Sequence, residues 1–249
     1  TPLDMAIRRA TSTEEADRLF LVNGDDGTIS CYSLLRAQQV VAPSSVTTDG
    51  EFQAVAVDVD TIYTVIKRNI NSANVYYVEV FDSTLHTDSA VYSASVSATG
   101  TAAHLAAETL DVIVDGNVQA QKTANGSGVV TFDRASASNY EIGLPFTVSV
   151  KTMPLEPRLQ SGSIKGFKKR IVKVNAEVFA TQAMTINGQQ VAFRNFGEDV
   201  LDTSVVPFTG IKTIGPLLGF VDEGTITVTQ SVPLDMTVLA LDYQLSVGQ

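Results

Sequence analysis

Residues 47–82 read TTDGEFQAVAVDVDTIYTVIKRNINSANVYYVEVFD, and this stretch decides the fold class. Valine, isoleucine, tyrosine and phenylalanine alternate there with polar residues, and glycine, aspartate and asparagine separate the runs. Alternation with a period of two, bounded by turn residues, is typical of short antiparallel strands. We expect strands over Phe52–Val57, Thr61–Arg68 and Val75–Phe81, with the last two joined through Asn69–Asn74.

The same alternation of apolar and polar residues extends toward the N-terminus. Leu19–Val22 and Thr28–Leu35 flank Asn23–Gly27, and asparagine, aspartate and glycine tolerate the positive φ of a tight hairpin turn. A further strand is expected over Gln39–Val41. About six strands therefore fall within the first 82 residues. This regular spacing fits a sandwich, a barrel or the blades of a propeller, and no exact internal repeat decides among them.

The amino-acid composition changes after Asp82. Residues 82–103 are rich in serine, threonine and alanine, and they predict a linker or an irregular segment. Beyond it, Leu110–Val114 and Val118–Thr123 flank Asp115-Gly116-Asn117 and predict a hairpin. Three further strands are expected over Val129–Phe132, Tyr140–Ile142 and Thr147–Thr152. We interpret this part of the chain as a small, self-contained β-barrel.

A boundary is expected at Pro154 and Pro157, because proline cannot donate to a strand ladder. A long strand over Ile171–Ala180 follows, and Thr225–Gln230 and Thr237–Leu245 close the chain around a turn at Pro233. The sequence therefore predicts an all-β protein in three parts. The parts are propeller-type strands over 1–82, a small β-barrel over 83–152, and a C-terminal β region over 153–249 that returns to the propeller body.

Strict alternation also assigns the faces of two strands. In the first, Phe52, Ala54 and Ala56 share one face. In the second, the residues that share a face are Val172, Val174, Ala176 and Val178.

Helix is scarce. Ser12 begins a capping-box pattern that either opens a short helix over Glu14–Arg18 or lies in a polar loop. The alanine-rich segment His104–Thr109 is the other candidate.

Composition limits the function classes. The 249 residues carry a formal charge of −10, which argues against broad adhesion to DNA or to anionic membranes. The single cysteine, Cys31, excludes an intrachain disulfide framework.

No apolar run approaches the ~20 residues that a spanning helix needs, so no membrane insertion is expected. Since the chain opens with threonine rather than methionine, we expect either a processed protein or the later part of a longer one.

Few residues suit catalysis. Asp58 and Asp60, two apart on one strand, have the residue types of a glycosidase pair, but a solvated turn fits them better. His86 and His104 lack any zinc spacing, and no nucleophile-elbow motif occurs. We therefore predict no enzyme activity, no cofactor and no metal site.

One concentration of positive charge stands out. It consists of five residues: Lys165, Lys168, Lys169, Arg170 and Lys173. They fit a solvated strand edge, where lysines discourage edge pairing. They equally fit a contact with an acidic neighbouring subunit or with DNA phosphates.

Several stretches, taken in order, resemble a known family. Residues 47–57, 62–68 and 75–82 are similar to a run in tail proteins of bacteriophages with the pattern TDG-x-F-x-SVAV, Y-x-VVKR-x-ING and RYIE-x-FD, with Ala54 where the pattern has serine. Residues 110–116, 128–132 and 142–147 resemble the FCCH module of ubiquitin-activating enzymes. The strand start Lys168–Ile171 and the segment Val228–Leu241 match the family's basic KKRI strand and its terminal V-x-Q-x-x-PLP-x-TVLAL pattern.

This resemblance is to the tail nozzle, or tail tubular protein B, family. It implies a β-propeller body with inserted β modules, and six copies that form a ring below the portal and adaptor. It further implies a structural virion protein of the tail that is assembled in the bacterial host cytoplasm. Its partners would be the adaptor, tail fibre or spike proteins, and genomic DNA in transit through the lumen. The FCCH-like module carries no ubiquitin chemistry with it.

Two other function classes stay open. A phage adhesin that binds glycans would use Tyr76, Tyr77 and Tyr92 as a stacking platform. A hydrolase would use Asp58 and Asp60, or His86.

Overall fold

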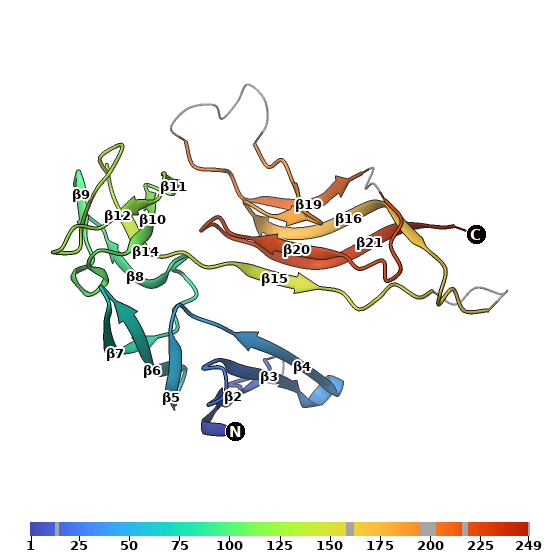
Figure 1. Cartoon of the computed structure of the whole chain (residues 1–249), viewed down its shortest axis with the longest axis horizontal. Helices are drawn as coiled ribbons and strands as arrows, with labels where there is room; N and C mark the ends of the chain where they lie inside the picture. The colour runs from blue at the N-terminus through green and yellow to red at the C-terminus, as the bar shows by residue number, and fades with distance from the viewer. Residues whose placement is uncertain (13–14, 158–161, 195–202, 216–218, 249) are drawn as a thin grey trace. The chain divides into compact units, whose positions relative to one another are not determined.

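The computed structural model describes residues 1–12, 15–157, 162–194, 203–215 and 219–248. Its regular structure is almost entirely antiparallel β-strand (Figure 1). Two short 3₁₀ turns, η1 (Arg36–Gln38) and η2 (Ala103–Leu105), are the helical elements of the described residues. The all-β prediction is confirmed.

The chain divides into two compact units. The first holds Thr1–Val112 and Ala120–Phe146, and the second holds Ile113–Gln119 and Thr147–Gln249. The three-part division at residues 82 and 152 stays a prediction.

The first unit opens with a four-stranded meander in the order β1-β2-β3-β4. Its strands are β1 (Pro2–Arg8), β2 (Asp17–Asn23), β3 (Ile29–Leu35) and β4 (Val40–Val46). The hairpin predicted around Asn23–Gly27 is confirmed by the antiparallel pairing of β2 with β3. Of the two alternatives for Glu14–Arg18, the helix is wrong from Glu15 onward, because β2 begins at Asp17 and no helix precedes it there; residues 13–14 lie outside the described part. Strand β1 was not predicted.

A three-stranded meander follows, in the order β5-β6-β7. Its strands are β5 (Glu51–Asp58), β6 (Thr61–Ile70) and β7 (Ala73–Val80). All three were predicted, but the connection between β6 and β7 is tighter than expected. Ile70 pairs with Ala73 across Asn71 and Ser72, whose φ values of 48° and 63° suit a two-residue hairpin turn.

The two meanders share one hydrophobic core. Its buried residues come from β2, β3, β5 and β6: Phe20, Val22, Ile29, Cys31, Phe52, Val55, Ile62 and Ile66. The face assignment for β5 was wrong beyond Phe52, because the pairing with β6 shifts between Phe52 and Ala54. This bulge inserts one residue and reverses the alternation. Val55 is therefore buried with Phe52, while Ala56 is exposed.

The rest of the first unit contains two small sheets. Strand β10 (Thr109–Val114) pairs with β14 (Tyr140–Leu144), and β14 pairs with β8 (Asp88–Ser93). The two-residue strand β12 (Lys122–Thr123) pairs with the start of β10. The two-residue strand β11 (Asn117–Val118) pairs with Ile113 and Val114 at the end of β10, and these four residues are counted with the second unit. A second sheet joins β9 (Thr99–Thr101) to β13 (Val129–Thr131).

Two predictions for this part were wrong. Residues 82–103 contain β8 and β9, although their polar composition predicted an irregular segment. No sheet among the described residues closes on itself, because β8 and β11 end the first sheet without pairing to each other. The part is therefore an assembly of open sheets and not a closed barrel.

The second unit is built from two sheets. One has the order β19-β16-β21, with β16 (Lys169–Thr181) at its centre between β19 (Phe208–Ile214) and β21 (Thr237–Val247). The other has the order β15-β20-β17-β18, with bounds Val148–Lys151, Thr227–Gln230, Thr185–Ile186 and Gln189–Gln190. The segment around Pro154 and Pro157 is free of strand, as predicted.

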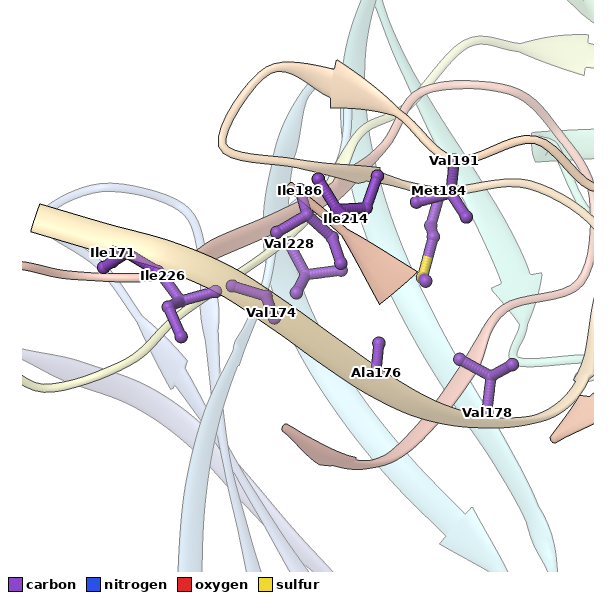
Figure 2. Close-up of a cluster of buried hydrophobic side chains, with 10 residues drawn as sticks. All are labelled: Ile171, Val174, Ala176, Val178, Met184, Ile186, Val191, Ile214, Ile226 and Val228. Atoms are coloured by element: carbon purple, nitrogen blue, oxygen red, sulfur yellow. The ribbon is translucent and has the colours of Figure 1, made fainter. Parts of the chain in front are cut away.

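Buried residues of both sheets form one core (Figure 2). Figure 2 shows Ala176 and Val178 pointing from β16 toward the side where Met184 lies. The face predicted for β16 is confirmed for Val174, Ala176 and Val178. It fails for Val172, because a register shift between Ile171 and Lys173 puts Ile171 in the core instead.

Candidate interaction surfaces

The predicted basic segment does not form one surface. Lys169 opens β16 and is 1% exposed. Its Nζ donates to the Asp222 carbonyl at 3.1 Å and lies 3.8 Å from a Glu156 carboxylate oxygen. Its backbone exchanges two hydrogen bonds with Val221. Lys169 therefore binds within its own unit and does not present its charge to a partner.

The other four residues differ in exposure. Lys165, Lys168 and Lys173 are exposed, whereas Arg170 is half-buried and interacts with other groups of the chain. A contact with an acidic subunit or with DNA, if it forms here, uses the three lysines.

A buried ionic cluster lies in the first unit, and sequence reasoning missed it. The Arg68 side chain on β6 is fully buried. Its guanidinium donates to Glu79 at 2.8 and 2.9 Å, to Asp88 at 2.8 and 3.0 Å, and to the Asp49 carbonyl at 2.6 Å. Thr48 donates a further hydrogen bond to Asp88. Burial alone lowers the pKa of Arg68, but the hydrogen bonds and charges of Glu79 and Asp88 outweigh it and raise that pKa.

The signal for this cluster was present in the sequence. Arg68 continues the alternation of Ile62, Thr64 and Ile66, which all point to the buried face of β6. A charged residue at a core position needs a buried counter-charge. The sequence did not identify the two carboxylates, because one of them follows a connection that looked irregular.

Ser89 and His104 meet beside this cluster, but not as a nucleophile and its base. The His104 Nε2 atom lies 3.1 Å from both the carbonyl oxygen and the Oγ of Ser89. Since a carbonyl only accepts, Nε2 is the donor and cannot take a proton from the serine. The Ser89 hydroxyl in turn donates to Glu79 at 2.9 Å. The arrangement therefore lacks the proton path of a hydrolytic triad.

His86 contacts a buried carboxylate, Glu141. The His86 backbone N–H and the Thr87 hydroxyl donate to Glu141 Oε1 at 2.7 and 2.8 Å, and His86 Nδ1 lies 3.5 Å from Oε2. Burial alone raises the pKa of Glu141, but the hydrogen bonds from His86 and Thr87 prevail and lower it. The carboxylate is thus held as an anion by its neighbours, which is a structural role.

The predicted carboxylate pair is engaged elsewhere. Asp60 lies in the turn after β5 and accepts from Arg8, whose Nη2 is 2.8 Å away. Asp58 is the last residue of β5 and is exposed. Asp60 therefore links its turn to β1 through Arg8, which is a structural contact.

The three tyrosines do not share a surface. Tyr76 pairs with Lys67 on the outer face of the β5-β6-β7 sheet, whereas Tyr77 pairs with Ile66 on the opposite face. The Tyr77 hydroxyl donates to the His104 carbonyl at 2.8 Å. Tyr92 is exposed on β8, in a different sheet. A stacking platform of all three is therefore not formed.

A groove of about 1330 Å³ lies within the first unit. Its lining includes Cys31 and Ser33 of β3, Ser44 of β4, and Ile62 and Thr64 of β6. No buried side-chain polar atom of the described residues lacks a hydrogen-bond partner.

The described residues include neither a candidate metal site nor a candidate membrane-spanning helix. No group of three or more histidine, cysteine, aspartate or glutamate residues there is placed to hold a metal ion. No helix in that part of the chain has the length and apolar character to cross a bilayer. Comparison of the chain with known protein families and with curated proteins gives no match to either.

Proposed function

We propose that this chain belongs to a structural virion protein of a phage tail, a component of the nozzle ring through which the genome is ejected. The ordered resemblance along the sequence is the starting point. The structural observation that carries the proposal is the face-to-face packing of two successive antiparallel meanders, β1–β4 and β5–β7, around one core.

This packing is what neighbouring propeller blades require. The meanders approach each other at β1 and β5, where the Val55 N–H donates to Asp4 Oδ2 at 3.0 Å. The groove is lined by residues of all seven strands of the two meanders, from Arg8 on β1 to Val80 on β7. A propeller is built from such antiparallel sheets, arranged as successive blades around a central channel. These features support a propeller body.

The part from β8 to β14 is the proposed FCCH-like module, in an open-sheet form. The Arg68 cluster joins it to the second meander through Asp88 on β8. Rigid attachment of this module to the second meander would help a ring of subunits to keep its shape and its lumen open.

The charge also fits a conduit. Each phosphate that a protein neutralises strengthens its adhesion to DNA. A chain with a formal charge of −10 favours sliding of the genome over retention. We expect the purified chain to show no stable binding of duplex DNA at physiological salt.

Electron microscopy of the purified protein, combined with native mass spectrometry, tests the proposal. The expected result is a ring of six copies with an open lumen. Monomers or two-fold dimers under all conditions, including addition of the phage's own tail adaptor, would overturn it. A glycan array in which the same protein binds specific sugars would replace it with the adhesin function.

A further inference from the structure

Asn125 lies in the connection between β12 and β13, where it is exposed and is followed by glycine. Its side-chain oxygen Oδ1 accepts hydrogen bonds from two backbone N–H groups, that of Ser127 at 2.9 Å and that of Val129 at 3.0 Å. The Asn125 backbone closes the same turn, because its N–H donates to the Val129 carbonyl and its carbonyl accepts from the Gly128 N–H. The turn therefore fixes two donors on one amide oxygen.

This arrangement matters because an asparagine that precedes glycine can cyclise without an enzyme. The glycine nitrogen attacks the side-chain carbon Cγ, and negative charge then develops on Oδ1. Backbone N–H groups that already point at such an oxygen stabilise the transition state, as in the oxyanion hole of an acyl-transfer enzyme. The N–H groups of Ser127 and Val129 have this position relative to Asn125 Oδ1.

The attacking and leaving groups are not held in place. Among the described residues, neither the Gly126 N–H nor the Asn125 Nδ2 has a hydrogen-bond partner. Gly126 is exposed, and no atom lies within 4 Å of the position that a Cβ would take there. Cyclisation therefore breaks no hydrogen bond at either nitrogen.

The sequence contains two other Asn-Gly pairs, and the structure restrains both. In the first, Asn23 Nδ2 donates to the hydroxyls of Thr28 and Ser30 at 2.9 and 3.0 Å. The N–H of Gly24 donates to the Thr1 carbonyl at 2.9 Å. Both the leaving nitrogen and the attacking nitrogen of this pair are therefore engaged.

The second pair is the two-residue turn between β17 and β18. Asn187 Oδ1 accepts from a single donor, the Thr227 N–H at 2.7 Å, and Asn187 Nδ2 donates to the Thr225 carbonyl at 3.5 Å. The Asn187 backbone N–H also donates to the Thr227 carbonyl. Both ends of this side-chain amide are thus tied to one neighbouring segment.

We propose that Asn125-Gly126 is a site of spontaneous self-modification, activated by the two N–H groups on Asn125 Oδ1. The Gly126 nitrogen forms a bond to Cγ, and the Cγ–Nδ2 bond breaks. Nδ2 leaves as ammonia with the proton that Gly126 loses, and a cyclic imide is left in the chain. Water then opens the ring at one of its two carbonyl carbons and leaves aspartate or isoaspartate. The reaction needs no partner molecule and takes no part in the proposed function.

The two products affect the turn differently. Aspartate keeps an oxygen that accepts from Ser127 and Val129, and its charge strengthens both hydrogen bonds. Isoaspartate adds one carbon to the main chain, immediately before Gly128. An added atom at Gly128 would lie 2.2 Å from the Ala102 carbonyl oxygen, so this part of the turn has little room to shift. We expect the aspartate form to keep its thermal stability and the isoaspartate form to lose some of it.

Peptide mapping by mass spectrometry tests the proposal on the natural chain, incubated in the folded state at mildly alkaline pH. Trypsin releases residues 19–36, 123–134 and 174–194 as three peptides, each with one Asn-Gly pair. Conversion is measured as the mass change from amide to acid. The same three peptides, synthesised and incubated free in solution, give each rate without the fold.

We expect Asn125 to convert about tenfold or more faster in the folded chain than in its free peptide, because the peptide lacks the two fixed donors. Asn23 and Asn187 should convert more slowly in the folded chain than in their free peptides. A folded-chain rate at Asn125 that equals or falls below the peptide rate would overturn the proposal, since the turn would then protect the asparagine.

Two variants assign the effect to the attacking nitrogen and to the donors. Gly126→Ala places a methyl group beside the attacking nitrogen, at a position with room for it, and should slow conversion of the folded chain. Ser127→Pro removes one donor from Asn125 Oδ1 and should lower the ratio of the folded rate to the rate of a free peptide with the same change. An unchanged ratio contradicts the role of the donors. Thermal unfolding verifies the fold of each variant, and if Ser127→Pro does not fold, the natural chain and its free peptide still decide.

Discussion

Arg68 and Asp88 form a two-point ion pair that joins β6 to β8, with nitrogen–oxygen distances of 2.8 and 3.0 Å. The pair links the second meander to the sheet that follows it in the chain. Because the arginine side chain is fully buried, its charge depends on Asp88 and Glu79 for compensation. This cluster fixes the relation between two parts of the first unit.

Replacement of Arg68 by methionine tests the cluster. The change keeps much of the side-chain volume but leaves two largely buried carboxylates without their counter-charge. Removal of one partner from a buried ion pair costs about 3–5 kcal/mol. Calorimetry is expected to show a matching loss of stability in the first unit. Lys67→Met is the control, since its ion pair with Glu51 is partly exposed and contributes about 1 kcal/mol or less. Equal effects of the two changes would contradict the role of Arg68.

Glu141 predicts a pH dependence. Its pKa is lowered in the folded protein, so its anion stabilises the fold above the ordinary carboxyl value of 4.5. That stability is lost as the pH falls below this value and through the lower folded-state pKa. Glu141→Gln is expected to cost about 1–3 kcal/mol at neutral pH and to flatten this part of the pH profile. Urea unfolding from neutral to acidic pH measures both.

Asp111 provides the control of opposite sign. Burial raises its pKa, and the hydrogen bond from Gln121 only partly offsets this. Its charge therefore opposes folding at neutral pH. Asp111→Asn keeps an oxygen to accept from Gln121, so stability is expected to stay the same or increase. A loss as large as that of Glu141→Gln would contradict the difference between the two sites.

Gly128 and Gly126 predict opposite responses to alanine. Gly128 has φ +75°, and an added Cβ would lie 2.2 Å from the Ala102 carbonyl oxygen. Gly128→Ala is expected to cost about 2 kcal/mol or more, because both strain and a backbone clash oppose it. Gly126 has no atom within 4 Å of an added Cβ. Thermal unfolding should show Gly126→Ala to be neutral or slightly stabilising, and a similar loss for both would be inconsistent with the turn geometry.

Lys169 and Lys168 are neighbours in the sequence, but Lys169 is buried and Lys168 is exposed. We therefore expect different effects when each is replaced by methionine. Lys169→Met removes the hydrogen bond to the Asp222 carbonyl and is expected to destabilise the second unit by about 1–3 kcal/mol. Lys168→Met changes an exposed side chain and should stay within about 0.5 kcal/mol of the natural chain. Chemical denaturation compares the two. Tests of assembly through the basic segment therefore need Lys165, Lys168 and Lys173, because loss of Lys169 also weakens the fold.

Strand content was predictable from the sequence because β-branched and aromatic residues alternate with turn residues at clear boundaries. Strands β5 and β6 were predicted almost to the residue. Strand β8 was missed because its sequence, DSAVYS, carries little apolar signal, and its pairing with β14 defines it. The bulges in β5 and β16 were missed for a related reason. Each depends on the partner strand and interrupts the alternation of faces, so the prediction failed after the bulge in β5 and before the bulge in β16.

The candidate sites were less predictable. Charge density along the chain indicated five basic residues, yet tertiary packing buries Lys169 among them. The Arg68 cluster joins residues that lie up to 40 positions apart, and neither carboxylate stands out in the sequence. The sequence feature that indicated the cluster was Arg68 itself, a charged residue at a core position of a strand.

The oligomeric mass of the protein, measured by native mass spectrometry with and without the tail adaptor, tests the central claim most directly. A six-copy species is the predicted result, and its appearance or enrichment with the adaptor would connect it to the tail. A monomer under both conditions would contradict a ring-forming nozzle component.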